Sequence, residues 1–328
     1  MEDRNQNAGT DLPQEIPVTL WQFRPVQFKF QLSDLTLFSF SLPMQTRSVR
    51  LSDETPPTAT PQLPLEPLEA GSQGFLIRAL PVSAELPQIA MIDGFLQYVP
   101  LQYAHCYIDL RTTFESYQNK FSSKTRATIG RKIRKYAEHS GGKIEWKSYA
   151  NPADMPEFLG FAREVSKKTY QEKLLDAGIP DSEEFARETL QLAKDGLVRA
   201  YLLFDQGRAV SYLYCPVQNG TLIYAYLGYD PSYIKHSVGT VLQWLAVEQM
   251  FEESKFKFFD FTEGQSDHKR LFATHQLRCA NVFLVKSTLR NSLIVHSHRR
   301  MDQFSRWLGL VVARYGLKEW IRRKLRFG

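Results

Sequence analysis

Cysteine is scarce in this chain: the three that occur, Cys106, Cys215 and Cys279, lie far apart and form no Cys-x-x-Cys pair. An odd and widely spaced set excludes a disulfide framework and a cysteine-based zinc site, and it is typical of a reducing compartment. Long apolar runs are missing as well, because no stretch approaches the roughly 18 consecutive apolar residues that a membrane-spanning helix needs. The first residues are polar and acidic, so we expect no secretory signal peptide and a cytoplasmic protein.

The short motifs of several enzyme classes are missing too. The sequence contains no Gly-x-Ser-x-Gly, no P-loop and no His-Glu-x-x-His, so it gives no support to a serine hydrolase, an NTPase or a zinc protease. His296 and His298 are separated by one residue but have no third ligand close by in the sequence, so we expect no metal site.

What the chain does have is the composition of a folded protein. Its 328 residues are 43% apolar and 23% charged, which excludes a disordered chain, and the length suggests two domains. The net charge of +6 is unevenly spread: residues 119–147 carry nine basic and two acidic side chains, and residues 290–328 carry ten and two. Two such segments indicate an anionic partner or, alternatively, solvated helix faces.

The pattern along the chain predicts four parts. Residues 1–16 have no periodicity and are expected to form a disordered tail. Residues 17–118 form a β-rich part, in which the alternation over residues 26–40 predicts a β-hairpin. We expect a larger part of helices and strands over 119–289, and basic amphipathic helices over 290–328.

The larger part has a characteristic order of elements. Two predicted helices, over 112–120 and 124–137, precede the order β-α-α-β-β-β-α-β-α-β, which runs from residue 143 to residue 286. Asp181 is expected to cap the second helix of this order, and Asn219-Gly220 predicts a tight hairpin turn. A helix near 239–251 connects two of the strands and predicts a βαβ crossover in a mixed sheet.

This order resembles the fold of the GNAT acyltransferases. Three segments make the resemblance closer to the Fem-like branch, and within it to the CelD-type acetyltransferases associated with bacterial polysaccharide synthesis; they read FSSKTRATIGRKIRKYAEHSGGKIEW, LGYDPSYIKHSVGTVLQWLAVEQM and FFDFTEGQSDHKRLFATHQ. The resemblance covers about residues 104–287. It implies an α/β (α+β) fold, with a GNAT-like mixed sheet and flanking helices. A smaller β-rich N-terminal unit, a candidate degenerate second GNAT-like half, comes before it.

The resemblance also implies where acetyl-CoA, or another acyl-CoA, binds as co-substrate. The start of the helix near 239 would hold the CoA pyrophosphate, because helix N-termini offer unpaired N–H groups to phosphates. His236 stands there in place of the usual arginine or glutamine. The pantetheine arm would lie along the edge of the preceding strand. The implied cofactor-binding residues are Leu227, Gly228, Tyr229, His236, Ser237, Val238, Gly239 and Thr240.

Four further residues are assigned to substrate binding. Lys124 and Arg126 form the Lys-x-Arg pair that opens the basic helix in the Fem-like branch. Tyr224 and Tyr226 lie on the strand that would carry the pantetheine, and whether they share one face depends on a β-bulge. The alternative role of both tyrosines is packing within the sheet.

Acylation of an amine needs a base for the ammonium proton, a donor for the oxyanion and an acid for the leaving thiolate. Asp260, Glu263 and Lys269 cluster at the end of one strand and the start of the next helix, and they are the candidate catalytic residues. The position of the lysine is the one that the resemblance assigns to a functional lysine. His268, His275 or bulk water would protonate the thiolate.

Three functions remain open from the sequence. The first is an acyl-CoA-dependent N-acyltransferase that acetylates an amino group of a sugar, an amino acid or a cell-envelope precursor. The second is a Fem-type transferase that takes an aminoacyl group from tRNA, whose backbone the basic helix would bind. The third is a non-catalytic binding protein on a GNAT scaffold.

The C-terminal segment 290–328 supports a separate hypothesis. Its apolar residues recur at helical spacing on either side of Gly316, which predicts two short amphipathic helices rich in arginine and tryptophan. Such helices suit a peripheral position on an anionic membrane surface, at the inner face of the membrane. The alternative is that the first helix packs on the N-terminal part. Because the segment follows the last predicted strand, we expect the core fold not to require it.

Overall fold

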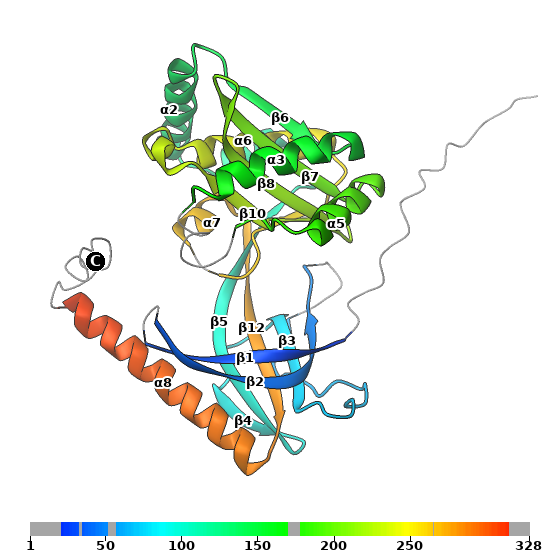
Figure 1. Ribbon diagram of the computed structural model, residues 1–328. Coiled ribbons are helices and arrows are strands. Elements are labelled where there is room, and N and C mark those ends of the chain that lie inside the picture. Colours follow the sequence, from blue (N-terminus) through cyan, green and yellow to red (C-terminus); the bar gives the residue numbers. More distant parts are fainter. Residues whose placement is uncertain (1–20, 33–34, 52–56, 170–177, 265, 315–328) are drawn as a thin grey trace, which may run out of the picture. The chain divides into compact units, whose positions relative to one another are not determined.

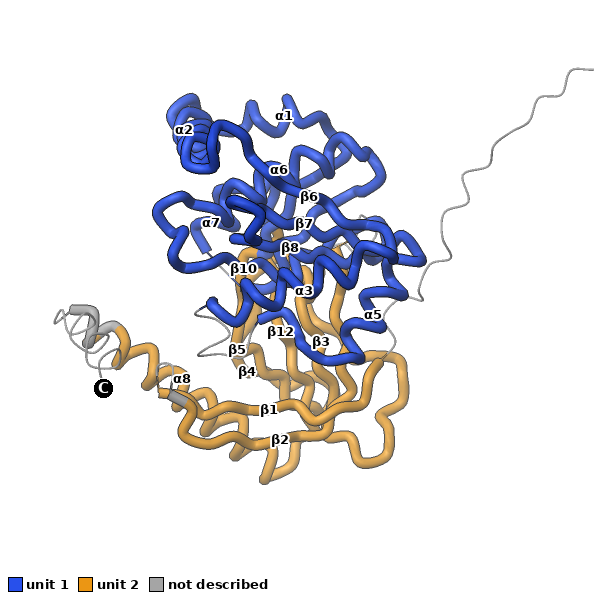
Figure 2. Tube along the Cα trace, turned by 45° about the horizontal axis from the view of Figure 1, so that its top comes forward, with its two compact units in different colours: residues 1–17, 105–276 blue, residues 18–104, 277–328 orange. Residues whose placement is uncertain are grey.

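The computed structural model of the chain describes residues 21–32, 35–51, 57–169, 178–264 and 266–314. These residues form two compact units (Figure 2). Unit 1 comprises residues 105–276, and unit 2 comprises the residues before 105 from Val18 onward together with those after 276. The boundaries differ from those predicted at 118 and 289, because two strands, β5 and β12, each run across a boundary.

Unit 1 is a mixed sheet with helices on both faces (Figure 1). Its strands in spatial order are β6 (Glu145–Tyr149), β7 (Val198–Asp205), β8 (Arg208–Gln218), β9 (Thr221–Ile223), β11 (Phe258–Asp260) and the end of β5 (Phe95–Asp109), with β10 (Tyr226–Tyr229) paired to β8. Its helices are α1 (Phe114–Asn119), α2 (Ser123–His139), α3 (Met155–Ser166), α5 (Glu183–Lys194), α6 (Val238–Glu253) and α7 (Asp267–Phe272), and its 3-10 turns are η1 (Pro152–Asp154) and η2 (Pro231–His236). β9 and β11 are parallel and connected through α6, which confirms the predicted crossover.

Each face of this sheet has its own apolar core. Along β7, Tyr201 and Leu203 belong to the core that includes residues of α1, α2 and α6. Ala200, Leu202 and Phe204 alternate with them and belong to the core that includes residues of α3 and α5. Since side chains alternate between the faces of a strand, β7 is apolar at nearly every position and lies in the middle layer of three.

Local sequence signals place most of the turns and helix starts. Asn219 and Gly220 both adopt positive φ, of 50° and 71°, and form the predicted tight turn between β8 and β9. The prediction for α5 is wrong in one detail, because its cap is Ser182, whose hydroxyl accepts an N–H of the first turn. Asp181 instead pairs with Arg163 at 3.0 Å.

Unit 2 contains the other strands and one long helix. Its strands in spatial order are β1 (Gln22–Leu32), β2 (Leu35–Ser48), β3 (Gly74–Pro81), β12 (His275–Lys286) and β5, and β4 (Ile89–Ile92) pairs with β5. β1 and β2 are antiparallel, which confirms the predicted hairpin, although its turn lies outside the described residues. The hairpin of β4 and β5, which turns at Asp93 and Gly94, is absent from the sequence prediction.

The helix α8 (Leu289–Arg314) is part of the core of unit 2, so the expectation that the fold does not require it is wrong. Ile294 and Val295 are buried in the core that β1 lines. The ring of His298 lies 5.5 Å from that of Phe28 and 5.3 Å from that of Phe30, both on β1. Removing the chain after residue 289 would therefore expose this core.

α8 begins one residue before the predicted segment 290–328 and is one continuous helix to residue 314. The second predicted helix, beyond Gly316, lies outside the described residues, as does the predicted tail over residues 1–16. In the part of the chain that the structure describes, no helix is long and apolar enough to cross a membrane.

Candidate functional site

A β-bulge divides the strand that the sequence predicts over residues 221–229. In β9, Leu222 pairs with Val217, whereas in β10 Tyr226 pairs with Tyr214, so the register moves by one residue between them. The N–H of Ala225 donates to the carbonyl of Tyr214 at 3.2 Å, so two residues of this strand face one residue of β8. This is the arrangement of a bulge, which bends the strand and shifts its later side chains to the other face.

The bulge answers the question that the sequence left open for the two tyrosines. Tyr224, Leu227 and Tyr229 all line one cavity. In a regular strand, Tyr224 and Leu227 would point to opposite faces because they are three residues apart, so one extra residue between them is needed to bring both to the cavity. Tyr226 packs on the opposite face, where its ring lies 5.8 Å from that of Phe185. The two tyrosines therefore have different surroundings, and only Tyr224 faces the cavity.

Beyond the bulge, β10 leaves β11 and exposes one edge of its backbone. The N–H of Asp230 donates to the carbonyl of Val210, and the hydroxyl of Ser211 donates to the carbonyl of Gly228, so the backbone groups of these even-numbered residues point to β8. Because successive residues of a strand direct their backbone groups to opposite sides, those of Leu227 and Tyr229 point away from β8. Among the described strands, β10 pairs with β8 alone.

Close packing fixes β10 to its neighbour at Gly228. A Cβ atom placed there would lie 2.3 Å from Cε1 of Tyr212, whose ring is buried on β8. Glycine is therefore required for β10 to lie against β8 at this height, and this spacing sets the width of the opening beside β11.

We expect Gly228→Ala to destabilise unit 1 by about 3 kcal/mol, because the added methyl group forces the buried ring or the strand to move. Chemical denaturation measures the loss. The matched control is Gly160→Ala on the exposed side of α3, where a Cβ would meet nothing within 4 Å. That change should stabilise by about 0.5–1 kcal/mol, because alanine favours helix. Equal stability of the two variants would contradict this account of β10.

The start of α6 lies directly after the open edge. Ser237 precedes the helix in the left-handed conformation, with φ of 54°, and its carbonyl accepts the N–H groups of Thr240 and Val241. The N–H groups of Val238 and Gly239 come before these and have no acceptor inside the helix, as is general for the first turn. They carry the positive end of the helix dipole and form a place for an anion.

The turn η2 before this helix is held in place by ionic contacts. Asp230 accepts hydrogen bonds from the N–H and hydroxyl of Ser232 and pairs with Arg208 at 2.6 Å and Lys168 at 3.7 Å. Although burial alone would raise the pKa of Asp230, these hydrogen bonds and charges lower it below its ordinary value. The carboxylate therefore stays ionised at neutral pH and ties the turn to β8.

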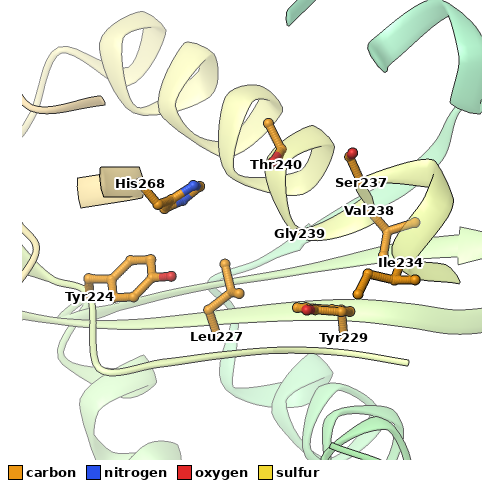
Figure 3. Close-up of a pocket in the computed structure, with 9 residues that line it drawn as sticks. All are labelled: Tyr224, Leu227, Tyr229, Ile234, Ser237, Val238, Gly239, Thr240 and His268. Carbon is orange, nitrogen blue, oxygen red and sulfur yellow. The ribbon is translucent and has the colours of Figure 1, made fainter. Parts of the chain in front are cut away.

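The bulge, the open edge and the helix start surround one cavity (Figure 3) of about 330 Å³. Such a volume is in the range of small-molecule sites. Tyr224 and His268 lie at one end of it, and Tyr229, Ile234 and Ser237 lie at the other. The lining residues are Tyr224, Leu227, Tyr229, Ile234, Ser237, Val238, Gly239, Thr240 and His268.

His268 is the lining residue with titratable chemistry at the Tyr224 end. Its Nε2 lies 2.6 Å from Oε1 of Gln243, a fully buried residue of α6. Since the amide oxygen can only accept, Nε2 carries the proton, and a neutral His268 presents the lone pair of Nδ1. Burial and the charges of Lys132 and Lys269 lower the pKa of His268 below 6.5, so the ring is neutral at pH 7. The other candidate histidine, His275, is exposed and stacks on Tyr107 instead.

The three candidate catalytic residues lie together at the end of β11, but none of them lines the cavity. Asp260 is 3% exposed, and its Oδ1 accepts from Nε2 of His105 at 2.5 Å and from the N–H of Thr262 at 2.7 Å. Nζ of Lys269 donates to the carbonyl of Glu263 at 2.8 Å. Burial lowers the pKa of Lys269, and the nearby acidic groups oppose that effect. This network fixes the loop from which α7, and with it His268, begins.

Other predicted site residues lie around the cavity rather than in its lining. His236 stacks on His139 of α2 at 4.0 Å, and burial together with the neighbouring cations lowers its pKa. Nζ of Lys135, also on α2, donates to the carbonyl of Lys235 at 3.0 Å. The basic helix thus runs beside the start of α6, while Lys124 and Arg126 lie in its first turns; Arg126 bonds Asn119 there at 3.2 Å.

A comparison with known protein families agrees with this geometry. Residues 123–270 match the family model described as the acetyltransferase (GNAT) domain. The match lies wholly inside unit 1 and includes the bulge, the start of α6 and α7. With the strand order above, it confirms the predicted GNAT-like fold, and it indicates an acyltransferase. No curated protein sequence matches the chain.

Several solved structures are similar at low identity. The C-terminal domain of a putative lysylphosphatidylglycerol synthetase from Agrobacterium fabrum has 9% identity and a TM-score of 0.46, over 70% of this chain and 72% of that one. L-PGS from Bacillus licheniformis has 16% identity and a TM-score of 0.43 over the same shares, 70% and 72%. FemX has 11% identity and a TM-score of 0.44 over 68% and 75%. At these values none of the three informs the activity of this chain.

Proposed function

We propose that the chain is an acyl-CoA-dependent N-acyltransferase. The observation that carries the proposal is the open backbone edge of β10, which leads along one cavity to the free N–H groups of α6. An acyl-CoA has the matching sequence of groups: a thioester, two amides and a pyrophosphate. The finer proposal, from the three sequence segments, is acetyl transfer to an amino group of a sugar, an amino acid or a cell-envelope precursor.

The residues present fit such a co-substrate, which supplies an activated acyl group. The backbone of Leu227 and Tyr229 would hold the amides, and the N–H groups of Val238 and Gly239 would hold the pyrophosphate. Gly239 has no side chain, so the phosphates can approach its backbone. A Cβ atom at this position would lie 3.5 Å from the side chain of Leu227 and 3.4 Å from that of Tyr229, and it would narrow the cavity that these side chains line. Lys135 of α2, whose Nζ donates to the carbonyl of Lys235, adds positive charge beside this end.

We assign the proton transfers to the two side chains at the other end of the cavity. Nδ1 of His268 would accept the proton of the incoming ammonium group, directly or through one water. The hydroxyl of Tyr224 would donate a proton to the leaving sulfur; burial raises the pKa of Tyr224, so the hydroxyl is protonated at neutral pH. Asp260, Glu263 and Lys269 would position α7, and Lys269 would add positive charge for an anionic acceptor.

Thermal denaturation in the presence of candidate ligands tests the proposal. Acetyl-CoA at about 100 times its dissociation constant should stabilise unit 1 by about 2.7 kcal/mol. Dephospho-CoA should stabilise less if Lys135 contacts the 3′-phosphate. Stabilisation by aminoacyl-tRNA but not by acetyl-CoA would overturn the proposal in favour of a Fem-type transferase. Stabilisation by neither would leave a non-catalytic binding protein.

A further inference from the structure

The side of α8 that faces away from the sheet carries a stripe of mainly apolar side chains, interrupted by one histidine and one arginine. Four large side chains of the stripe are at least half exposed: Leu289 is 93% exposed, Leu293 70%, Phe304 50% and Trp307 57%. The rings of Phe304 and Trp307 are stacked at 5.8 Å. With His296 and Arg300, these residues recur every three or four positions, so they share one face of the helix for about 27 Å.

The opposite face of α8 fixes which side is presented. Asn291, Ile294 and Val295 are buried, and His298 lies against the rings of β1. The helix cannot turn its apolar stripe inward without losing these contacts. The stripe is therefore a surface of the folded unit and not a face that belongs in its core. It is defined by Leu289, Leu293, His296, Arg300, Phe304 and Trp307.

The charge around the stripe has one sign. Between residues 289 and 314 the helix carries five arginines and a single acid, Asp302. Arg300 lies within the stripe, and Arg290 and Arg306 are exposed beside it. Asp302 faces away from the stripe and pairs with Arg306 at 2.6 Å. A partner that covers this face must therefore be apolar and surrounded by negative charge.

We propose that α8 docks unit 2 on an anionic lipid bilayer, with the stripe at the level of the lipid headgroups. Leucine and aromatic side chains on one face, with arginines around them, are the pattern of helices that lie in the membrane interface without crossing it. Trp307 and Phe304 are suited to that depth, and the arginines bind the lipid phosphates. A second copy of the chain is a poorer partner, because two stripes placed together would bring Arg300 and Arg290 of both copies close to one another.

Co-sedimentation of the full chain with vesicles tests the docking surface and does not depend on the proposed acyltransferase activity. The wild-type chain should bind vesicles of phosphatidylcholine mixed with phosphatidylglycerol, and it should be released by high salt. Vesicles of phosphatidylcholine alone should bind at least about tenfold less, because their zwitterionic surface has no net negative charge to attract the arginines. Leu293→Glu combined with Trp307→Glu should lower binding to the mixed vesicles by about tenfold or more, since it puts two carboxylates into the apolar face.

A matched variant separates the stripe from general surface hydrophobicity. Leu65→Glu combined with Met91→Glu makes the same chemical change at two other exposed positions of unit 2, which are 101% and 58% exposed. This control should bind the mixed vesicles like the wild type, and unchanged thermal denaturation shows that both variants fold. The proposal is overturned if the wild type does not bind, or if both double variants lose binding equally. It is also overturned if the stripe variant merely converts a dimer into a monomer.

Discussion

Gly239→Glu should lower the affinity for acetyl-CoA by about 100-fold or more while the chain stays folded. The residue lies in the first turn of α6, where the N–H groups of Val238 and Gly239 are available to an anion. A carboxylate there would occupy the anion site and repel the phosphates, which reverses the favourable field of the helix N-terminus. Isothermal titration with acetyl-CoA measures the change, and circular dichroism confirms the fold.

The matched control for this prediction is Gly239→Ala. An alanine Cβ would lie 3.4 Å from Cδ1 of Tyr229 and 3.5 Å from Cδ2 of Leu227, a contact that small side-chain movements relieve. We therefore expect a loss of affinity of only a few-fold for alanine. If glutamate and alanine reduce the affinity equally, the effect is steric, and if neither reduces it, the phosphates bind elsewhere.

His268→Gln should lower turnover by about 100-fold with little change in the affinity for acetyl-CoA, because it removes the proton acceptor and leaves the phosphate end of the cavity intact. Turnover is followed as release of the CoA thiol from acetyl-CoA with an accepted amine. His275→Gln is the matched control, since this exposed histidine stacks on Tyr107 and does not line the cavity. Its turnover should be that of the wild type.

The pH profile distinguishes a base from a residue that only shapes the cavity. The pKa of His268 is lowered by burial first and by Lys132 and Lys269 next, so Nδ1 is unprotonated at neutral pH. Turnover of the wild type should therefore fall only at more acidic pH, as Nδ1 becomes protonated. In His268→Gln this acidic limb should disappear. A variant that keeps the limb would show that another group accepts the proton.

The sequence predicts the elements of unit 1 well because their signals are local. Periodic apolar residues and the Asn219-Gly220 turn are visible within a few positions, and the structure has each corresponding element, although the cap of α5 is Ser182 and not the predicted Asp181. The bulge at Ala225 has no such signal. It follows from the pairing of β10 with β8, and without it the face of Tyr224 is undetermined.

The sequence names His268 only as one of three candidate acids for the thiolate, and its contact with Gln243 has no local signal. Its partner Gln243 is 25 residues away in the sequence, on the helix α6, and the contact exists only once α6 and α7 pack together. The predicted catalytic residues Glu263 and Lys269 do meet, as their short separation suggests. In unit 2, the alternation over residues 26–40 reveals its hairpin, but the long helix α8 is recognisable as core only through its contact with β1.

Unit 2 has a consequence for how the protein is made. Its strand β12 lies between β3 and β5, yet the ribosome completes β12 only after all of residues 105–276. At ordinary rates of synthesis that takes roughly 10–30 s. During this time apolar side chains such as Phe75, Ile77 and Val99 stay uncovered, because they form one core with Val282 and Leu284, which are made later. Unit 1 is one continuous stretch of chain and has no such delay. We therefore expect the chain to be most prone to aggregation while these N-terminal strands lack β12.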